Sequence, residues 1–114
     1  MLRNKTRMAL RILAVLNDQK RMKLEDVAEQ CGVCLSYIEQ VVALLKPTNV
    51  IDGKRGPNGG YIINQSILDR MKLGDLDLAC YPDDIESHFE DESVLLFDVS
   101  ELNVGDMISY YRGT

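Results

Sequence analysis

The sequence predicts a mainly α-helical fold with a small β-hairpin, arranged as a winged helix-turn-helix plus a short helical C-terminal extension. Three observations lead to this fold class. Apolar residues recur at helical spacing through most of residues 6–46. Gly32 interrupts this pattern with a turn between two helical segments. Two short β-rich runs, Val50-Ile51 and Tyr61-Ile62-Ile63, then flank a glycine-rich stretch.

The first helix is expected over residues 6–16, with Thr6 as its N-cap. The second helix begins near Leu24, and Gly32 ends it. The run Ala28-x-x-x-Gly32-Val33 places a small residue where two helices touch, then a glycine in the turn, then an apolar anchor. This order is typical of a helix-turn-helix.

The third helix is expected over residues 35–46, because Pro47 cannot continue it and Asn49 suits a left-handed cap. One face of this helix is apolar. The first turns carry polar groups that can hydrogen-bond base edges or phosphates, namely Ser36, Tyr37, Glu39 and Gln40.

The stretch GKRGPNGGY, residues 53–61, has three possible interpretations. A phosphate-binding loop would place its lysine after the glycines and lead into a helix, whereas Lys54 precedes the glycines and a β-rich run follows them. A flexible linker would lack the β-branched residues on both sides. The remaining interpretation is a hairpin that carries Lys54 and Arg55 at its tip, which is the wing of a winged helix.

Two further helices are expected over residues 66–78 and from residue 84 to about residue 96, the second with a capping box formed by Asp83 and Glu86. Charge divides the chain in a similar place. Residues 1–74 hold twelve Lys and Arg against seven Asp and Glu, whereas residues 75–114 hold one Arg against eleven acids. This asymmetry suggests a basic surface for an anionic partner and a separate acidic segment.

The motifs in the third helix and the wing resemble those of a known family. Residues 35–40, LSYIEQ, and residues 55–61, RGPNGGY, are similar to the LSYLEQ and RGPGGGY signatures of winged-helix regulators related to the iron–sulfur cluster regulator IscR. The resemblance covers roughly residues 3–76. It implies that the third helix enters the major groove of DNA and that Arg55 reaches the minor groove. Because the family includes repressors, it also implies repression.

The resemblance and the chemistry of the side chains together give a set of expected DNA contacts on the first helix, the third helix and the wing. These residues are Lys5, Arg7, Ser36, Tyr37, Glu39, Gln40, Lys54, Arg55, Gly56 and Gly59. We accordingly divide the chain into a winged-helix DNA-binding domain, residues 1–78, and an acidic helical extension, residues 79–114, that serves dimerisation or partner contact.

The chain departs from the family where many members hold an iron–sulfur cluster through three closely grouped cysteines. The corresponding region contains only Cys80 and His88. A cluster needs about four ligands, usually thiolates. Two chains of a dimer could pool Cys80 and His88 into two cysteines and two histidines, which is the one route left to a cluster. For a single chain we expect no cluster, no other cofactor and no metal site.

Cys31-Gly-Val-Cys34 could be a redox motif or half of a zinc site. The simpler interpretation is that Cys31 is a small buried residue and that Cys34 caps the third helix, where family members usually have serine. A thiol at a helix N-terminus can have a lowered pKa, so Cys34 could act as an oxidation switch. A single histidine and a solvated acidic face give no catalytic constellation, so an enzyme is not expected.

The expected function is therefore a sequence-specific, DNA-binding transcription regulator that binds double-stranded DNA in the cytoplasm as a homodimer. A partial apolar stripe for dimer contact is formed by Ile85, Phe89, Leu96 and Val99. The alternative is a protein-interaction module whose acidic segment binds a basic partner in the transcription machinery. We expect no membrane association, since no long apolar run or signal peptide is present.

Overall fold

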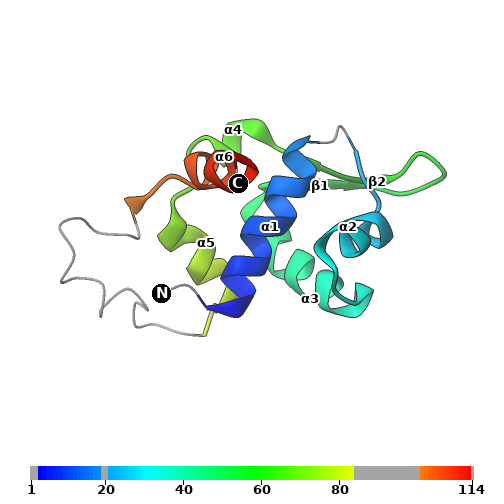
Figure 1. Cartoon of the computed structure of the whole chain (residues 1–114), viewed down its shortest axis with the longest axis horizontal. Helices are drawn as coiled ribbons and strands as arrows, with labels where there is room; N and C mark the ends of the chain where they lie inside the picture. Colours follow the sequence, from blue (N-terminus) through cyan, green and yellow to red (C-terminus); the bar gives the residue numbers. More distant parts are fainter. Residues whose placement is uncertain (1–2, 19–20, 84–100, 114) are drawn as a thin grey trace.

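The computed structural model describes residues 3–18, 21–83 and 101–113 of the chain (Figure 1). The helical elements are α1 Asn4–Asp18, α2 Leu24–Cys31, α3 Leu35–Leu45, the short 3-10 helix η1 Lys46–Thr48, α4 Gln65–Leu68, α5 Leu73–Cys80 and α6 Val104–Gly113. The strands are β1 Ile51–Lys54 and β2 Gly60–Ile63. The predicted mainly α-helical fold with one hairpin is confirmed.

Helix α1 lies at the centre of the molecule, with α2 and α3 on one side and α5 and α6 on the other (Figure 1). Leu10, Ile12 and Leu13 of α1 are fully buried. Burial of each such side chain stabilises a fold by about 1.5–3 kcal/mol. The apolar stripe of α1 therefore organises the single core against which the helix-turn-helix packs.

The turn between α2 and α3 forms as the sequence predicts. Gly32 has a φ of 70°, and its N–H donates to the carbonyl oxygen of Ala28 at 2.9 Å. Asn49 ends the short helix η1 with a φ of 65° in the left-handed region. Both residue types tolerate this conformation at low cost.

The hairpin is antiparallel, with Ile51 paired to Ile63 and Lys54 paired to Gly60 at its outer end. The backbone of Met22 pairs with Tyr61 on the other edge of β2, as an isolated bridge. The wing is therefore joined, one residue from the outer end of its paired strands, to the connection that leads into α2.

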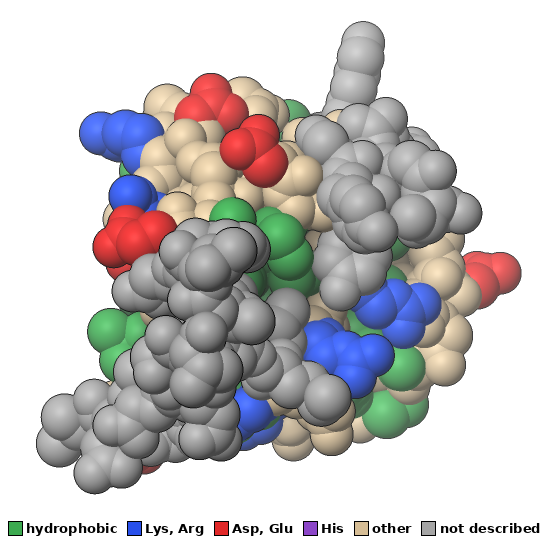
Figure 2. All heavy atoms as spheres, turned by 60° about the vertical axis from the view of Figure 1, so that its left-hand side comes forward, with side chains coloured by type: hydrophobic (Ala, Val, Ile, Leu, Met, Phe, Trp, Pro, Cys, Tyr) green, Lys and Arg blue, Asp and Glu red, His purple; other side chains and the backbone are tan. Residues whose placement is uncertain are grey.

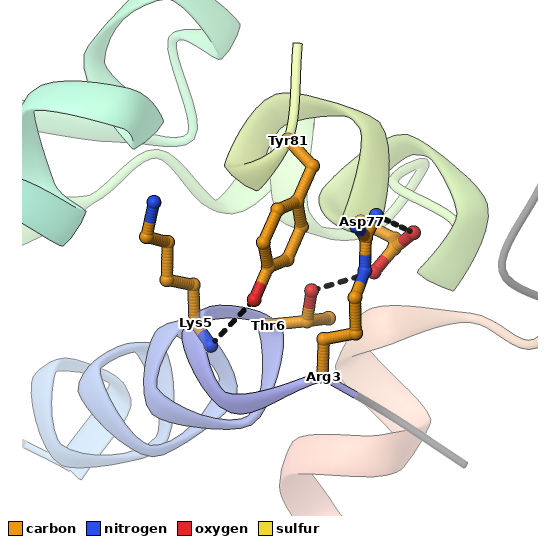
Figure 3. Close-up of polar contacts among 5 residues, drawn as sticks. All are labelled: Arg3, Lys5, Thr6, Asp77 and Tyr81. Carbon is orange, nitrogen blue, oxygen red and sulfur yellow. Dashed lines mark hydrogen bonds and ion pairs between the residues drawn. The ribbon is translucent and has the colours of Figure 1, made fainter. Parts of the chain in front are cut away.

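The expected N-cap role of Thr6 is wrong. Helix α1 begins at Asn4, and Thr6 is fully buried inside it. The Thr6 hydroxyl donates to the buried carboxylate of Asp77 at 2.7 Å, and the Arg3 guanidinium donates to the same carboxylate at 3.1 Å (Figure 3). The Arg3 guanidinium also lies 3.3 Å from the Tyr81 ring centroid. These contacts fasten the start of α1 to the end of α5.

The single helix expected over residues 66–78 is also wrong, because two helices, α4 and α5, stand there with a break between them. Within the break, the N–H of Val104 donates to the Met71 carbonyl oxygen at 2.9 Å, and the N–H of Leu73 donates to the Leu102 carbonyl oxygen at 2.7 Å. Backbone groups that pair with a distant segment cannot also continue a helix.

Helix α6 packs against α1, and its Val104 and Ile108 side chains are fully buried. The helix expected from residue 84 to about 96 lies outside the described residues, as does the stripe proposed for dimer contact. The division of the chain after residue 78 stays a prediction, and α6, which lies beyond that boundary, packs into the same core as α1. Within the described ranges, no helix has the length and apolar character needed to span a membrane.

Candidate nucleic-acid interface

Helix α3 buries one face and exposes the other. Ile38, Val41 and Leu45 are fully buried in the core. Ser36, Glu39 and Gln40 are exposed. Because the apolar face packs into the core, the three polar side chains on the first turns point outward and are accessible to a ligand.

Tyr37 differs from its polar neighbours because it is half-buried and packs against the core. Burial raises the pKa of its hydroxyl, and the nearby Tyr81 and Cys80 raise it further. Tyr37 therefore extends from α3 toward the end of α5, so only part of its side chain remains available to a ligand.

The wing tip is an exposed turn between β1 and β2. Lys54, Arg55 and Gly56 are all exposed. The N–H of Gly59 donates to the carbonyl oxygen of Gly56 at 2.9 Å and closes the turn. A Cβ atom at Gly59 would lie 2.4 Å from the carbonyl oxygen of Lys54, so only glycine fits this turn.

An open groove of about 680 Å³ lies between the start of α2, the exposed side of α3 and the wing. It brings together five of the expected contact residues, namely Glu39, Lys54, Arg55, Gly56 and Gly59. Two cations that were not among the expected contact residues, Lys23 and Lys46, also line it. Lys46 could have been found, because it lies two turns after Glu39 on the same helical segment.

The remaining expected residues do not line this groove. Ser36 and Gln40 are exposed on α3 outside it, and Arg7 is exposed on α1. Lys5 lies at the start of α1, where its backbone N–H donates to the Tyr81 hydroxyl at 3.1 Å and its ammonium lies 5.3 Å from the Tyr81 ring centroid (Figure 3). The expected contact residues therefore fall into two groups, one on α3 and the wing and the other on α1.

The side of the molecule toward α5 and α6 has a mixed charge. Figure 2 shows basic and acidic side chains on this face, with apolar side chains between them. The acidic residues between 84 and 98, on which the protein-interaction alternative depends, lie outside the described residues, so that alternative stays a prediction.

The three cysteines occupy different environments. Cys31 and Cys80 are buried, and burial raises the pKa of both thiols, that of Cys80 to about 11. Cys34 is exposed at the N-cap of α3. Its Sγ lies 3.3 Å from the Ser36 hydroxyl, and a hydrogen bond from that hydroxyl, followed by one from the Tyr37 backbone, lowers the pKa of the thiol.

The described residues do not gather a set of metal ligands around these cysteines. In residues 3–18, 21–83 and 101–113, no group of three or more His, Cys, Asp or Glu side chains is placed to hold a metal ion. Cys31 and Cys80 would have to leave the core to ligate iron.

Comparison with known proteins gives the family of the chain. Residues 2–86 match the family described as Rrf2, iron-dependent transcriptional regulator. The chain is 33% identical over 54 residues to the HTH-type transcriptional regulator IscR of Pectobacterium carotovorum, a match that covers 47% of this chain and 33% of the relative. It is 39% identical over 46 residues to a putative HTH-type transcriptional regulator, ORF2, of Azotobacter vinelandii, covering 40% and 28%. The matches span about a third of the length of these curated relatives.

Solved structures with the same fold extend the likeness beyond the matched sequence. CymR, the global cysteine regulator of B. subtilis, superposes with a TM-score of 0.71 at 22% identity, covering 96% of this chain and 97% of CymR. IscR of T. potens superposes with a TM-score of 0.71 at 21% identity, covering 97% and 88%. At these identities the likeness shows the winged-helix fold.

The relatives are transcriptional regulators rather than enzymes, in agreement with the sequence analysis. The resemblance that LSYIEQ and RGPNGGY indicate is confirmed. Since the family match extends over most of the chain, this protein belongs to the Rrf2 family of transcriptional regulators.

Proposed function

We propose that this chain is a sequence-specific DNA-binding transcription regulator in which α3 enters the major groove of duplex DNA and the wing tip reaches an adjacent minor groove. One observation carries the proposal: Glu39 of α3 and Arg55 of the wing tip line the same open groove of the protein. A carboxylate on an exposed helix and a guanidinium on a neighbouring hairpin are thereby presented to one ligand surface. Membership of a family of transcriptional regulators supports this assignment.

The exposed side chains of α3 read base edges in this proposal. A Glu39 carboxylate accepts a hydrogen bond from the cytosine N4 amino group, and a Gln40 amide pairs with the adenine N6 and N7 atoms. The Ser36 hydroxyl can pair with either kind of base. Tyr37, which is half-buried, contacts the DNA backbone through its exposed edge.

The wing and α1 supply contacts that depend mainly on phosphate and on groove shape. Arg55 enters a narrow minor groove, whose negative potential is stronger than that of a wide one. Lys54 contacts phosphate, and Gly56 and Gly59 allow the backbone of the turn to approach the duplex closely. Lys5 and Arg7, which lie away from the wing groove, contact phosphates and fix the orientation of the protein on the duplex.

In the cell we propose a cytoplasmic homodimer without an iron–sulfur cluster of its own, which represses transcription by occupying its operator. A dimer doubles the number of base pairs that two short reading helices contact. The separate, mostly buried positions of the three cysteines support the absence of a cluster.

The direct test is selection of duplexes from a pool with a randomised centre, followed by affinity measurements at increasing salt. We expect enrichment of a defined sequence and a linear fall of log affinity with log salt, because Lys and Arg contacts release counterions from the DNA. A scrambled duplex of the same length and composition is the control. A pool that stays random after repeated selection, with the protein folded, contradicts the proposal.

A further inference from the structure

We propose that Tyr61 is the positioning residue of the wing, and that it holds Arg55 at a fixed place relative to α3 by joining the outer part of the hairpin to the segment that leads into α2 and to the end of α3. This inference rests on the proposed DNA-binding function and adds a residue that controls it. Tyr61 need not touch DNA in this role, because it acts through the placement of the wing tip.

The backbone of Tyr61 fixes the wing to the segment that leads into α2. Its N–H donates to the carbonyl oxygen of Met22 at 2.8 Å, and its carbonyl oxygen accepts from the N–H of Met22 at 3.0 Å. The neighbouring Gly60 has a φ of 131°, and a Cβ atom there would lie 2.6 Å from the Met22 carbonyl oxygen. The backbone at Gly60 thus lies so close to Met22 that a residue with a side chain would not fit there.

The Tyr61 ring fixes the wing to the other side of the hairpin and to the end of α3. Gly53 is the partner of Tyr61 in the strand register. A Cβ atom at Gly53 would lie 2.8 Å from Cε1 of Tyr61, so the ring covers the place where a side chain would stand. Beyond the ring, the Lys46 ammonium lies 5.5 Å from its centroid, within the range of about 6 Å for a cation–π contact.

These contacts place Tyr61 at a junction of three elements. Its backbone connects to the start of α2, its ring lies across β1, and Lys46 connects the ring to the end of α3. Tyr61 also lines the groove that Glu39 and Arg55 share. A change in the position of the ring would therefore alter the spacing between the base-reading side chain and the wing tip.

A role in positioning predicts a result that ordinary packing does not. If Tyr61 acts by placing Arg55, replacing Tyr61 weakens DNA binding only while Arg55 is present. If the ring merely stabilises the fold, the same replacement weakens binding by the same factor whether Arg55 is present or not. A double-mutant cycle separates the two cases.

The experiment measures affinity for one duplex enriched by the wild-type protein, using the full chain in four forms: wild type, Tyr61→Leu, Arg55→Ala and the double variant. We expect Tyr61→Leu to lose on the order of tenfold in affinity in the wild-type background and less than about twofold in the Arg55→Ala background, as coupled residues do. Tyr61→Phe, which keeps the ring, should retain wild-type affinity. Equal losses in both backgrounds overturn the inference.

Lys46→Gln provides a second route that does not depend on Tyr61→Leu being folded, since Lys46 is exposed. Its loss of affinity should likewise shrink in the Arg55→Ala background. An equal loss in both backgrounds shows Lys46 to be an independent phosphate contact and counts against the inference. If the wild-type protein enriches no duplex, the proposed function itself fails. If it enriches one and Arg55→Ala weakens it, an uncoupled Tyr61 overturns only the positioning role.

Discussion

At the scale of single residues, the exposed side chains of α3 and the wing tip differ in the kind of DNA feature they can recognise. Glu39 can accept hydrogen bonds only, and Arg55 can donate them and carries a permanent positive charge. Both are exposed and line one groove. Their substitution should therefore have different consequences.

We predict that Glu39→Ala changes which sequences are bound, because it removes a base-edge contact worth about 1–3 kcal/mol. Arg55→Ala should instead weaken binding and relax the preference for narrow minor grooves. Selection from the randomised duplex pool, repeated with each variant, measures both effects. Glu29→Ala, at an exposed position of α2 outside the groove, is a control of the same charge as Glu39. Wild-type preferences in both variants would show that the DNA-reading assignment is wrong.

We predict that Cys34 is the first cysteine to react with a thiol reagent. Hydrogen bonds from Ser36 and from the Tyr37 backbone lower its pKa, so its thiolate forms at a lower pH than that of an ordinary thiol. Cys80 is buried with a pKa of about 11 and should stay protected below that pH. Alkylation with iodoacetamide, followed by mass spectrometry across a pH series, gives the order of reaction.

Ser36→Ala is the matched variant for this experiment, because it removes the first hydrogen bond to the Cys34 thiol. The pH at which Cys34 reacts should rise in this variant. If Cys31 or Cys80 reacts before Cys34 in the folded protein, the assigned environments are wrong.

Sequence patterns predicted the residues that share a local motif but missed those that depend on tertiary packing. LSYIEQ and RGPNGGY indicate Glu39 and Arg55 because those residues lie within the motifs themselves. Lys23 joins the groove only because the hairpin folds back beside α2. The hydroxyl of Thr6 suits an N-cap, yet Asp77, a residue far along the chain, binds it inside the core. Such long-range partners leave no local signal.

At the scale of elements, the wing is held by backbone contacts that tolerate no side chain at particular positions. Gly60 and Gly56 both have positive φ, at 131° and 107°. A Cβ atom would meet the backbone of Met22 at Gly60 and open space at Gly56. Comparing substitutions at these two glycines therefore separates the cost of backbone strain from the cost of steric overlap.

We predict that Gly60→Ala destabilises the protein by at least about 1 kcal/mol more than Gly56→Ala. Both variants carry the strain of a positive φ, about 1–3 kcal/mol, and only Gly60→Ala adds a steric overlap with the Met22 carbonyl group. Equilibrium unfolding in urea, followed by circular dichroism, gives both free energies of unfolding. Equal losses would show that the bridge between Met22 and Tyr61 does not hold the wing in place.

The hairpin and the first three helices could be predicted because each follows a local periodicity, and Gly32 and Pro47 mark the ends of the second and third helices. The break between α4 and α5 could not. Residues 66–78 carry a helical pattern, and the interruption comes from backbone pairing of Met71 and Leu73 with residues near α6. The partner residues lie some thirty residues later in the chain. A local helical pattern contains no information about such a distant partner.

At the scale of the whole molecule, one winged helix presents a single reading helix and a single wing. Such a unit contacts few base pairs, whereas a two-fold pair contacts two half-sites about one helical turn apart. The expected function therefore requires either a second copy or a long continuous contact. The molecule, with extents of 49 × 29 × 25 Å, is small for a long continuous contact.

We predict that the protein is a homodimer at micromolar concentration without DNA. Two-fold symmetry would place two α3 helices on successive turns of one face of the duplex. Sedimentation velocity over a range of protein concentrations measures the assembly. A monomer throughout that range would contradict the prediction.

We also predict that protein purified without oxygen carries no stoichiometric iron. Cys31 and Cys80 are buried and Cys34 lies at the start of α3, so the described residues place fewer than the four ligands of a cluster within reach of one another. Iron analysis and visible absorption provide the measurement, with Cys80→Ala as the matched variant. Stoichiometric iron that is lost in Cys80→Ala would make this chain a cluster-binding member of its family.

The contact between α1 and α6 has a consequence for synthesis of the protein. Val104 and Ile108 complete the core beside α1, so α1 cannot be fully covered until the chain has grown by about 90 further residues. At about 5–20 residues per second, the ribosome needs roughly 5–18 s to add them. During that interval the apolar stripe of the nascent α1 is a target for chaperones and for association with other nascent chains. Completion of the core around α1 therefore waits for α6, although α3 and the wing are made long before it.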